Sequence, residues 1–525
     1  MNAELPMGWA FATADELSDS VPNALAIGPF GSNLKVQDYR TSGVPLVFVR
    51  EIRRERFGDV DTKYISSEKA AELAAHVVRP GELLITKMGD PPGDTAVYPM
   101  DRPDAVITSD CIKLSPNSKI SSSDFLALLL RSPNVRSLLV EQTKGVAQQK
   151  LSLKRFREIQ FPLPPLNEQR RIVAKLEALL ARSRRAKNAL DVIPALLERF
   201  RQSVLAAAFR GDLTRDWREA NQKVAPASKL LQQIRSERRR RWEEAELERM
   251  RDRGKVPKDE KWKSEYQEPE CDDEANAFGP VSDLGWVVAP VEGLCDPSRG
   301  VPYGIVQTGD ETEGGVPTVR CGDLKDFCIE LSLLKRVDPS IEQQYSRTRL
   351  AGGEVLLAIR GTVGGVAVAS EEMRGMNISR EVAMLPVLPG VEPRFVMYLL
   401  ASPTATAMLA GRTKGVAQQG VNLSDLRSFP VPLPSLAEQA QIVRKIDAAM
   451  SHARGIARAC TEAVSRTPSL EAAILAKAFR GELVPQDPTD EPASALLQRI
   501  RAEQQQTTDS ESNPRSKRRR ETKVA

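Results

Sequence analysis

The chain has 525 residues and a formal net charge of +5, from 75 Lys and Arg against 70 Asp and Glu, so its charge permits a nucleic-acid partner without requiring one. Its six cysteines form no CxxC pair and it has only two histidines, which argues against a zinc site and a disulfide framework. The N-terminus lacks the basic and apolar regions of a signal peptide and no run of about 18 apolar residues occurs, so we expect a cytoplasmic protein without membrane contact.

Residues 1–166 have the pattern of a compact domain with mixed α/β structure. Short β-type runs alternate with Gly, Pro and Asp, and two short helices follow serine N-caps. The predicted elements are strands at 44–49 and 82–86 and helices at 67–75 and 123–130. The domain ends at the PLPP segment 162–165, which cannot enter a helix interior.

Residues 167–213 are predicted to form a first helical arm, and residues 437–483 a second. Apolar residues recur along both at alternating steps of four and three, the spacing of a coiled-coil seam. The predicted seam residues are Ile172, Leu176, Leu179, Ala186 and Leu190 in the first arm and Ile442, Ile446, Ala449 and Ile456 in the second. Neither helix is apolar enough to stand alone, so we expect the two to pack on each other, antiparallel if an internal two-fold relates the halves. Pro194 and Pro468 are expected to interrupt the helices.

The remaining segments are a helical and charged linker at 214–283, a second domain at 284–436 and, at 484–525, a short helix with a tail expected to be disordered. The linker contains four consecutive arginines, 238–241, between glutamates. This run is more typical of a solvated helix or a partner contact than of a DNA-binding element.

The two halves of the chain are copies of one unit. The heptapeptide TKGVAQQ at 143–149 recurs unchanged at 413–419, and the similarity continues in register for about sixty residues. The two domains themselves diverge. Because the heptapeptide is kept where its surroundings differ, we favour a structural role for Gln148, Gln149, Gln418 and Gln419 at the joint between domain and arm, with adenine recognition as the alternative.

No catalytic centre is predicted, and no metal site. The sequence DPPG at 90–93 resembles the [DN]PP[YF] motif of adenine-N6 methyltransferases, but glycine stands where the aromatic residue is needed, so we interpret it as a turn. The chain has no GxxxxGK[ST] motif, and its two histidines support no nucleophilic triad.

Basic residues in the predicted loops of each domain are the candidates for DNA contact. Lys and Arg bind phosphates, which gives affinity, and guanine edges, which gives sequence preference. The candidates are Lys35, Arg50, Arg53, Arg54 and Lys87 in the first domain and Arg299, Arg320, Arg347, Arg360 and Arg380 in the second.

Three motifs, each present twice, carry a resemblance to a known family. They are TKGVAQQ, then PLPPL or PLPSL with a following Glu-Gln, then AFRGDL or AFRGEL. Together they closely resemble the specificity subunit of type I restriction-modification systems, over residues 5–503.

The resemblance implies an α+β protein in which two target-recognition domains with pseudo-two-fold symmetry are joined by an antiparallel coiled coil. Each domain would read one half of a bipartite site in double-stranded DNA, and the helices would set the spacing. The helices would also dock two methyltransferase subunits and, through them, the restriction and translocase subunits. No cofactor is expected in this chain, because S-adenosylmethionine, ATP and Mg²⁺ would belong to the partner subunits.

Two alternatives remain open at this point. The first is a duplicated protein-binding scaffold without DNA specificity. The second is a modification enzyme with an unrecognised active site.

Overall fold

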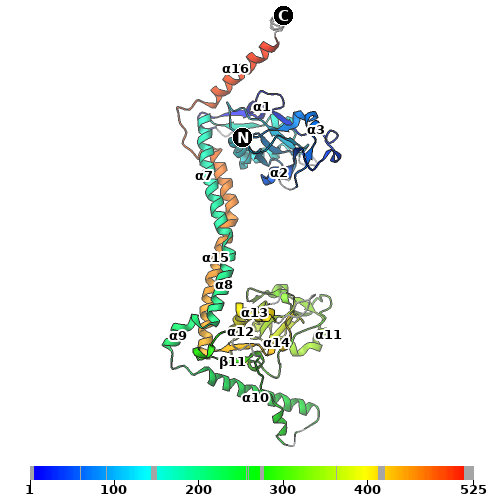
Figure 1. The fold of residues 1–525 in the computed structure, drawn as a ribbon, viewed down its shortest axis with the longest axis vertical. Helices are drawn as coiled ribbons and strands as arrows, with labels where there is room; N and C mark the ends of the chain where they lie inside the picture. Colours follow the sequence, from blue (N-terminus) through cyan, green and yellow to red (C-terminus); the bar gives the residue numbers. More distant parts are fainter. Residues whose placement is uncertain are drawn as a thin grey trace. The chain divides into compact units, whose positions relative to one another are not determined.

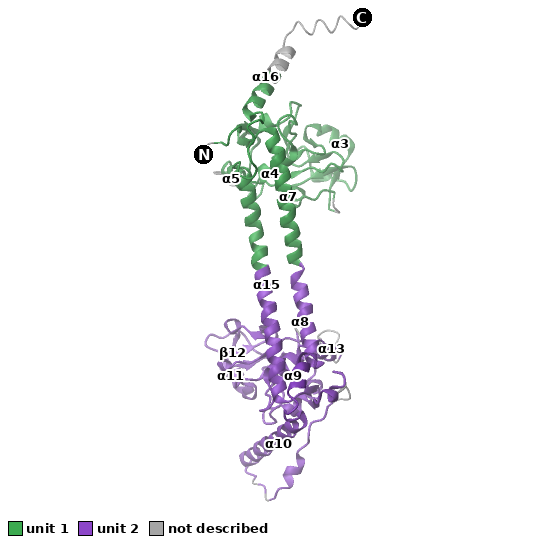
Figure 2. Ribbon diagram, turned by 90° about the vertical axis from the view of Figure 1, so that its left-hand side faces the viewer, with its two compact units in different colours: residues 1–191, 461–525 green, residues 192–460 purple. Residues whose placement is uncertain are grey.

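The computed structural model describes residues 5–512, except 59–60, 90, 144–149, 256, 258, 272–276, 362–363 and 412–419. The chain divides into two compact units (Figure 2). The first contains Met1–Asp191 and Thr461–Ala525, and the second contains Val192–Cys460. Each unit therefore holds one domain together with parts of both arms.

Two four-stranded sheets form the first domain. Their strands are β2 (Leu25–Ile27), β9 (Cys111–Leu114), β6 (Leu83–Thr86) and β7 (Thr95–Val97) in one sheet and β4 (Tyr64–Ile65), β3 (Val44–Val47), β8 (Ala105–Ile107) and β5 (Val77–Val78) in the other, in these spatial orders. Every residue of β6 and β9 is buried. Both faces of this antiparallel sheet are therefore covered at its two central strands, which also bury Thr86 and Lys113.

Short helices cover the sheets of the first domain. They are α1 (Ala14–Leu17), α2 (Val49–Arg54), α3 (Ser67–Glu72), α4 (Ser123–Arg131), α5 (Pro133–Glu141) and α6 (Leu153–Arg157). The side chains of Ser66 and Ser122 cap α3 and α4 as the sequence indicated. Helix α3 is shorter than predicted, and a separate 3₁₀ turn follows it at Ala74–His76.

Helix α2 was not predicted. The strand predicted at 44–49 ends at Val47, and the arginines that were placed in or beside a predicted loop lie on the helix Val49–Arg54. The carboxylate of Glu51 accepts from the backbone N–H of Phe48 at 2.9 Å and is itself buried. This contact satisfies an N–H at the start of the helix from inside the core.

The second domain repeats these elements. Its strands are β12 (Val316–Val319), β13 (Leu324–Lys325), β14 (Cys328–Ile329), β15 (Lys335–Val337), β16 (Val355–Ala358), β17 (Val366–Val368), β18 (Asn377–Ile378) and β19 (Val382–Leu385). They form three sheets, with orders β15-β12-β18, β17-β16-β19 and β13-β14. Its helices are α11 (Pro339–Glu342), α12 (Pro393–Leu400), α13 (Pro403–Gly411) and α14 (Leu423–Arg427).

A two-stranded ribbon closes each domain where its arm begins. In the first domain β1 (Ala10–Thr13) pairs with β10 (Gln160–Leu163), and in the second β11 (Val287–Pro290) pairs with β20 (Pro430–Leu433), both antiparallel. The start and the end of each domain therefore meet at the base of an arm helix.

The first arm consists of α7 (Leu166–Asp191) and α8 (Ile193–Phe209), and the second is the single helix α15 (Leu436–Ala478) (Figure 1). The predicted interruption near Pro194 is present, since Val192 lies outside both helices and Pro194 is in the first turn of α8. The prediction at Pro468 is wrong, because α15 continues through this residue. An interior proline costs a helix roughly 3 kcal/mol, because it lacks an N–H and its ring clashes with the preceding turn.

The arm helices pack on each other inside each unit. In the first unit Ser183 Oγ donates to Glu471 Oε1 at 2.8 Å, which joins α7 to the C-terminal part of α15. In the second unit Leu205 and Phe209 of α8 share a core with Ile442, Ile446 and Met450 of α15. Ala186 and Ile456 do not belong to the seam as predicted, because both are exposed. From Ile446 the fully buried positions of α15 are Met450 and Ala453, which follow at intervals of four and then three residues. This order is the reverse of the predicted one, although Ala449 is half-buried.

The short helices that follow the arms pack on the domains. Helix α10 (Ala227–Asp252) packs Leu231 and Ile234 into the core of the second domain. Helix α16 (Ala493–Ser512) packs on β1 of the first domain, where the backbone N–H of Ala493 donates to Gly8 O at 2.8 Å. Helix α10 belongs to the first half of the sequence but lies in the unit of the second domain. Helix α16 belongs to the second half but lies in the unit of the first domain.

The corrected seam predicts different effects for two isoleucines of α15. Ile446→Ala should lower the free energy of unfolding of the second unit by about 2–4 kcal/mol, because Ile446 is fully buried and its truncation leaves a cavity. Ile456→Ala should change it by less than about 0.5 kcal/mol, because Ile456 is 47% exposed. Urea unfolding of the full chain measures both changes. Equal losses of unfolding free energy in the two variants would show that Ile456 belongs to the seam after all.

Candidate nucleic-acid interface

Several strands of the first domain end at one edge, where backbone hydrogen bonds tie them together. The N–H of Thr108 donates to Val47 O at 3.0 Å, that of Lys87 to Asp110 O at 2.7 Å, and that of Leu151 to Lys87 O at 2.9 Å. Lys150 also forms an antiparallel bridge with Met88. We call residues 47–48, 87–88, 108–110 and 150–151 the first strand-end edge.

The second domain has the same bonds in the same order. The N–H of Ser379 donates to Val319 O at 2.8 Å, that of Ile359 to Glu381 O at 2.8 Å, and that of Val421 to Ile359 O at 2.9 Å. Gly420 bridges Arg360 in the same way. Residues 319–320, 359–360, 379–381 and 420–421 form the second strand-end edge, and the bonds match the two edges residue by residue.

The matched edges carry different side chains. At the three positions that follow Val47, Lys87 and Thr108, the first edge has Phe48, Met88 and Ser109, whereas the second edge has Arg320, Arg360 and Arg380. Backbone bonds do not depend on side-chain identity, so this exchange leaves the edge itself intact. The two domains thus present surfaces of different chemistry on the same backbone arrangement.

The first edge takes its positive charge from other positions. Lys87 lies on the edge, with its Nζ donating to Ser109 O at 3.3 Å. Helix α2, which starts directly after Phe48, adds three exposed arginines, namely Arg50, Arg53 and Arg54. Arg50 pairs with Glu51 and Arg53 with Asp94, each at 2.8 Å. Arg54 has no hydrogen-bond or ion-pair partner among the residues that the structure describes.

The second edge gathers three of the five arginines predicted for its domain. Arg360 and Arg380 are exposed, and neither side chain is paired within the described part of the chain. Arg320 bonds to Asp323 in its own turn but keeps 43% of its side chain exposed. These groups can therefore reach an external anion without breaking a buried ion pair.

Arg299 and Arg347 lie elsewhere in the second domain. With Arg349 and Arg374 they line a cavity of about 490 Å³ that includes Leu350 and Ala351, which precede β16, whereas the edge follows β16. Arg299 donates to the buried carboxylate of Glu354 and, at 2.6 Å, to Arg349 O. Arg299 therefore lies away from the second strand-end edge and neutralises a buried charge inside the domain, and its contact with DNA stays a prediction.

Lys35 is exposed in the loop before the short turn Val36–Asp38. Its backbone N–H donates to Asp38 Oδ2 at 2.7 Å, which stabilises the turn. Its ammonium has no partner within the described residues.

The joints between domains and arms are built from buried pairs whose structural role was not predicted from the sequence. Trp9 Nε1 donates to Glu168 Oε2 at 3.1 Å in the first unit, and Trp286 Nε1 donates to Glu438 Oε2 at 3.0 Å in the second. Next to these glutamates, the amide of Gln169 donates to Pro164 O at 3.0 Å. Gln439 repeats this bond with Pro434 O at 3.1 Å. The recurrence of Gly-Trp and Glu-Gln in both halves was the signal that could have identified the joint.

The heptapeptides were predicted to form this joint. Residues 144–149 and 413–419 lie outside the described residues, so the role of their glutamines stays a prediction. Thr143 is buried and its Oγ1 donates to Val140 O at 2.7 Å. The residues that follow the two heptapeptides, Lys150 and Gly420, lie on the strand-end edges.

The two joints differ in charge. Glu438 Oε1 accepts from Thr214 Oγ1 at 2.7 Å and from Arg218 Nη1 at 2.6 Å. Glu168 Oε1 is buried with no partner among the described residues. Burial raises the pKa of the Glu168 carboxyl above its ordinary value, although the bond from Trp9 and the charge of Arg171 act in the opposite direction.

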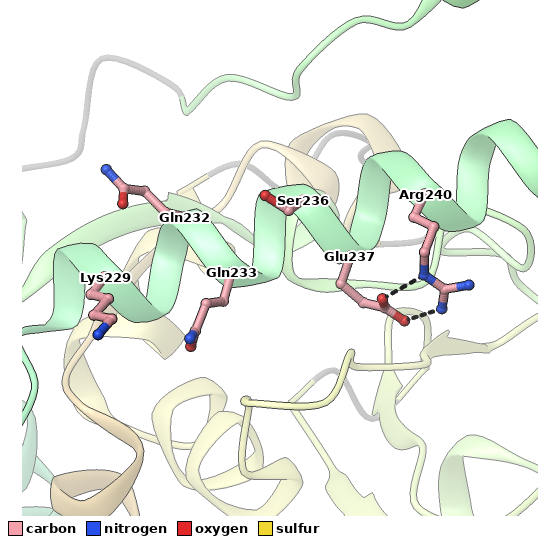
Figure 3. A pocket seen from close by; sticks show the side chains of 6 residues that line it. All are labelled: Lys229, Gln232, Gln233, Ser236, Glu237 and Arg240. Atoms are coloured by element: carbon pink, nitrogen blue, oxygen red, sulfur yellow. Dashed lines mark hydrogen bonds and ion pairs between the residues drawn. The ribbon is translucent and has the colours of Figure 1, made fainter.

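The four-arginine run lies on α10 and is used in two ways. Arg238 is buried, with its Nε donating to Glu292 O at 3.2 Å, and Arg241 pairs with Asp296. These two residues fasten α10 to the domain, so the prediction of a solvated run is wrong for them. Arg239 and Arg240 pair with glutamates of the same helix. Figure 3 shows Arg240 beside Glu237 on a polar face of α10 that lines a hollow of about 450 Å³.

Within the described residues no group of three or more His, Cys, Asp or Glu side chains could hold a metal ion. No described helix combines the length and the apolar character needed to cross a membrane.

The fold and the edges define a class: a duplicated binding protein in which one domain fold, carried twice on paired helices, presents two different basic surfaces. The sequence model described as the type I restriction modification DNA specificity domain matches residues 62–193 and 286–455, together more than half of the chain. The chain therefore belongs to this family.

Individual relatives agree with the family. The type I restriction enzyme EcoBI specificity subunit of Escherichia coli is 29% identical over 475 residues, 88% of this chain and 87% of the relative. The EcoKI specificity subunit of Escherichia coli strain K12 is 23% identical and covers 95% of this chain and 96% of its own. The crystal structure of the HsdS subunit from Thermoanaerobacter tengcongensis has the same fold, with a TM-score of 0.52 at 20% identity over 92% of this chain and 99% of that chain.

The unequal joints predict opposite effects of one substitution. A carboxyl whose pKa is higher in the folded than in the unfolded state loses its contribution to stability as the pH rises from its ordinary value near 4.5 through the raised value. Glu168→Gln should therefore raise the melting temperature of the first unit at pH 7 and flatten its dependence on pH.

The matched substitution Glu438→Gln should lower the stability of the second unit by about 2–4 kcal/mol, because it leaves Arg218 partly buried without its counter-charge. Calorimetric melting of the full chain between pH 4 and pH 8 measures both effects. Equal destabilisation by the two substitutions would contradict the difference in charge between the joints.

Proposed function

We propose that the chain is the DNA sequence-specificity subunit of a type I restriction-modification complex, that it is not itself catalytic, and that each domain reads one half of a bipartite DNA site. Family membership and the relatives' names support the class of function. The observation that carries the half-site assignment is the exchange of Phe48, Met88 and Ser109 for Arg320, Arg360 and Arg380 on matching backbones. Copies that bound the same sequence would have no need for such different edges.

The arms are proposed to set the distance between the half-sites and to dock two methyltransferase subunits, through which the restriction and translocase subunits join. Exposed basic residues along α7, including Arg182, Arg184 and Arg185, support a polar contact surface on the arm. S-adenosylmethionine, ATP and Mg²⁺ would be bound by these partners rather than by this chain.

Substitution of the edge arginines tests DNA contact. The triple variant Arg320→Ala, Arg360→Ala and Arg380→Ala should weaken DNA binding and reduce the slope of log affinity against log salt by up to about three, roughly one for each phosphate that is no longer neutralised. Arginines that contact bases instead would each cost about 1–3 kcal/mol and relax discrimination in the second half-site only.

Arg374→Ala is the matched control, because Arg374 is exposed and belongs to the same domain but lines the cavity with Arg299 and Arg347. Salt titrations of binding by the chain with its methyltransferase partner supply the measurement. A triple variant that binds as Arg374→Ala does would refute the edge as the DNA interface.

Mapping of adenine methylation tests the function as a whole. DNA modified by the methyltransferase partner with this chain should carry an interrupted motif that disappears when the chain is omitted. Replacing residues 284–430 by the counterpart from a relative should change one half of the motif and keep the other. Methylation that does not depend on this chain would refute the proposal, and methylation by this chain alone would indicate an enzyme.

A further inference from the structure

A glycine passes close to the edge in each domain. A Cβ atom built on Gly28 would lie 1.9 Å from Thr108 O, and one built on Gly304 would lie 1.8 Å from Ile378 O. No side chain fits at these distances, so only glycine can occupy the position where the chain crosses the edge. The residues directly after the glycines are therefore held beside the strand-end edges.

The first crossing leads into a short exposed tip, residues 30–33. Pro29 and Leu34 are buried on either side of it, and a turn closes it, since Asn33 N donates to Phe30 O at 2.8 Å. Phe30 is 71% exposed. Two residues span at most about 7 Å, so the Cα atom of Phe30 lies within about 7 Å of that of Gly28, which is packed against Thr108 and Ser109.

The second crossing leads into a similar tip, residues 306–307. Ile305 is buried and its carbonyl accepts from the N–H of Arg380 at 2.8 Å. On the other side, Lys335 Nζ donates a hydrogen bond to Thr308 Oγ1 at 3.1 Å. Between these anchors Val306 and Gln307 are exposed. Each domain thus projects an apolar side chain, and an amide side chain in the same tip, next to its basic edge.

This combination fits bases better than phosphates. Phosphate oxygens accept hydrogen bonds and attract cations, but they offer nothing to an exposed phenyl or isopropyl group. In the major groove, by contrast, apolar side chains contact the thymine methyl group and amide side chains bond to adenine. The basic residues of the strand-end edge would bind the phosphates of DNA, and the tip beside them would contact the bases.

We propose that the two tips are base-reading elements, in which Phe30 with Asn33 contributes to recognition of the first half-site and Val306 with Gln307 to recognition of the second. The proposal rests on the DNA-specificity function proposed above. In this proposal the strand-end edges provide DNA affinity that depends on salt concentration, and the tips provide discrimination between base pairs.

Phe30→Ala tests the first tip. Using the full chain with its methyltransferase partner, binding is measured to the duplex found by methylation mapping and to duplexes with each base pair of both half-sites replaced in turn. Phe30→Ala should weaken binding to the cognate duplex at least fivefold and remove discrimination at one or two adjacent positions of the first half-site. The salt slope and the second half-site should be unchanged, in contrast to the edge variant.

Met100→Ala is the matched control, since Met100 is 78% exposed in the same domain but lies beside Gly81, which precedes β6, whereas the edge follows that strand. Phe30→Leu, which keeps an apolar group, should retain part of the discrimination and guards against misfolding as an explanation. The double variant Val306→Ala, Gln307→Ala should give the same pattern in the second half-site alone.

Three outcomes separate the possibilities. Loss of discrimination confined to the first half-site supports the proposal. Discrimination by Phe30→Ala equal to that of Met100→Ala overturns it while leaving the DNA-specificity function in place. A wild-type complex that shows no preference between the duplexes overturns the proposed function itself.

Discussion

One buried contact fixes each domain to its arm: a tryptophan indole donates to a glutamate in the first turn of the arm helix. The ribbon between the first and last strands of the domain brings the two partners together. A buried donor or acceptor without a partner costs about 1–3 kcal/mol, so the bond favours one orientation of the helix on its domain. The position of each strand-end edge relative to its arm follows from this joint.

The edges show how one fold can carry two surfaces. The strands are held there by backbone hydrogen bonds, which are the same in both domains whatever side chains follow them. Arg320, Arg360 and Arg380 could therefore replace Phe48, Met88 and Ser109 without disturbing the strands. The crossing glycines are the exception, because no side chain fits between their Cα atoms and the neighbouring carbonyl groups.

Local signals predicted the regular elements well where the cause was local. The serine caps of α3 and α4 were found because a cap and its helix are adjacent in sequence. Helix α2 was not found, because Phe48 precedes it in place of a usual capping residue and the carboxylate that bonds to the Phe48 N–H, that of Glu51, is buried. The predicted seam position of Ile456 and the predicted break at Pro468 were also wrong. The seam could not be fixed from the sequence because it depends on how the helix packs against its neighbour.

The sequence by itself determined the duplication, the two arms, the family and the set of basic residues that could contribute to a DNA-binding surface. Only the tertiary structure decided which of these residues share an edge, because a partner such as Glu354 lies far along the chain from Arg299. It also decided that α10 packs on the second domain and α16 on the first. Periodicity reports which face of a helix is apolar, whereas the surface that covers that face is set by contacts between distant segments.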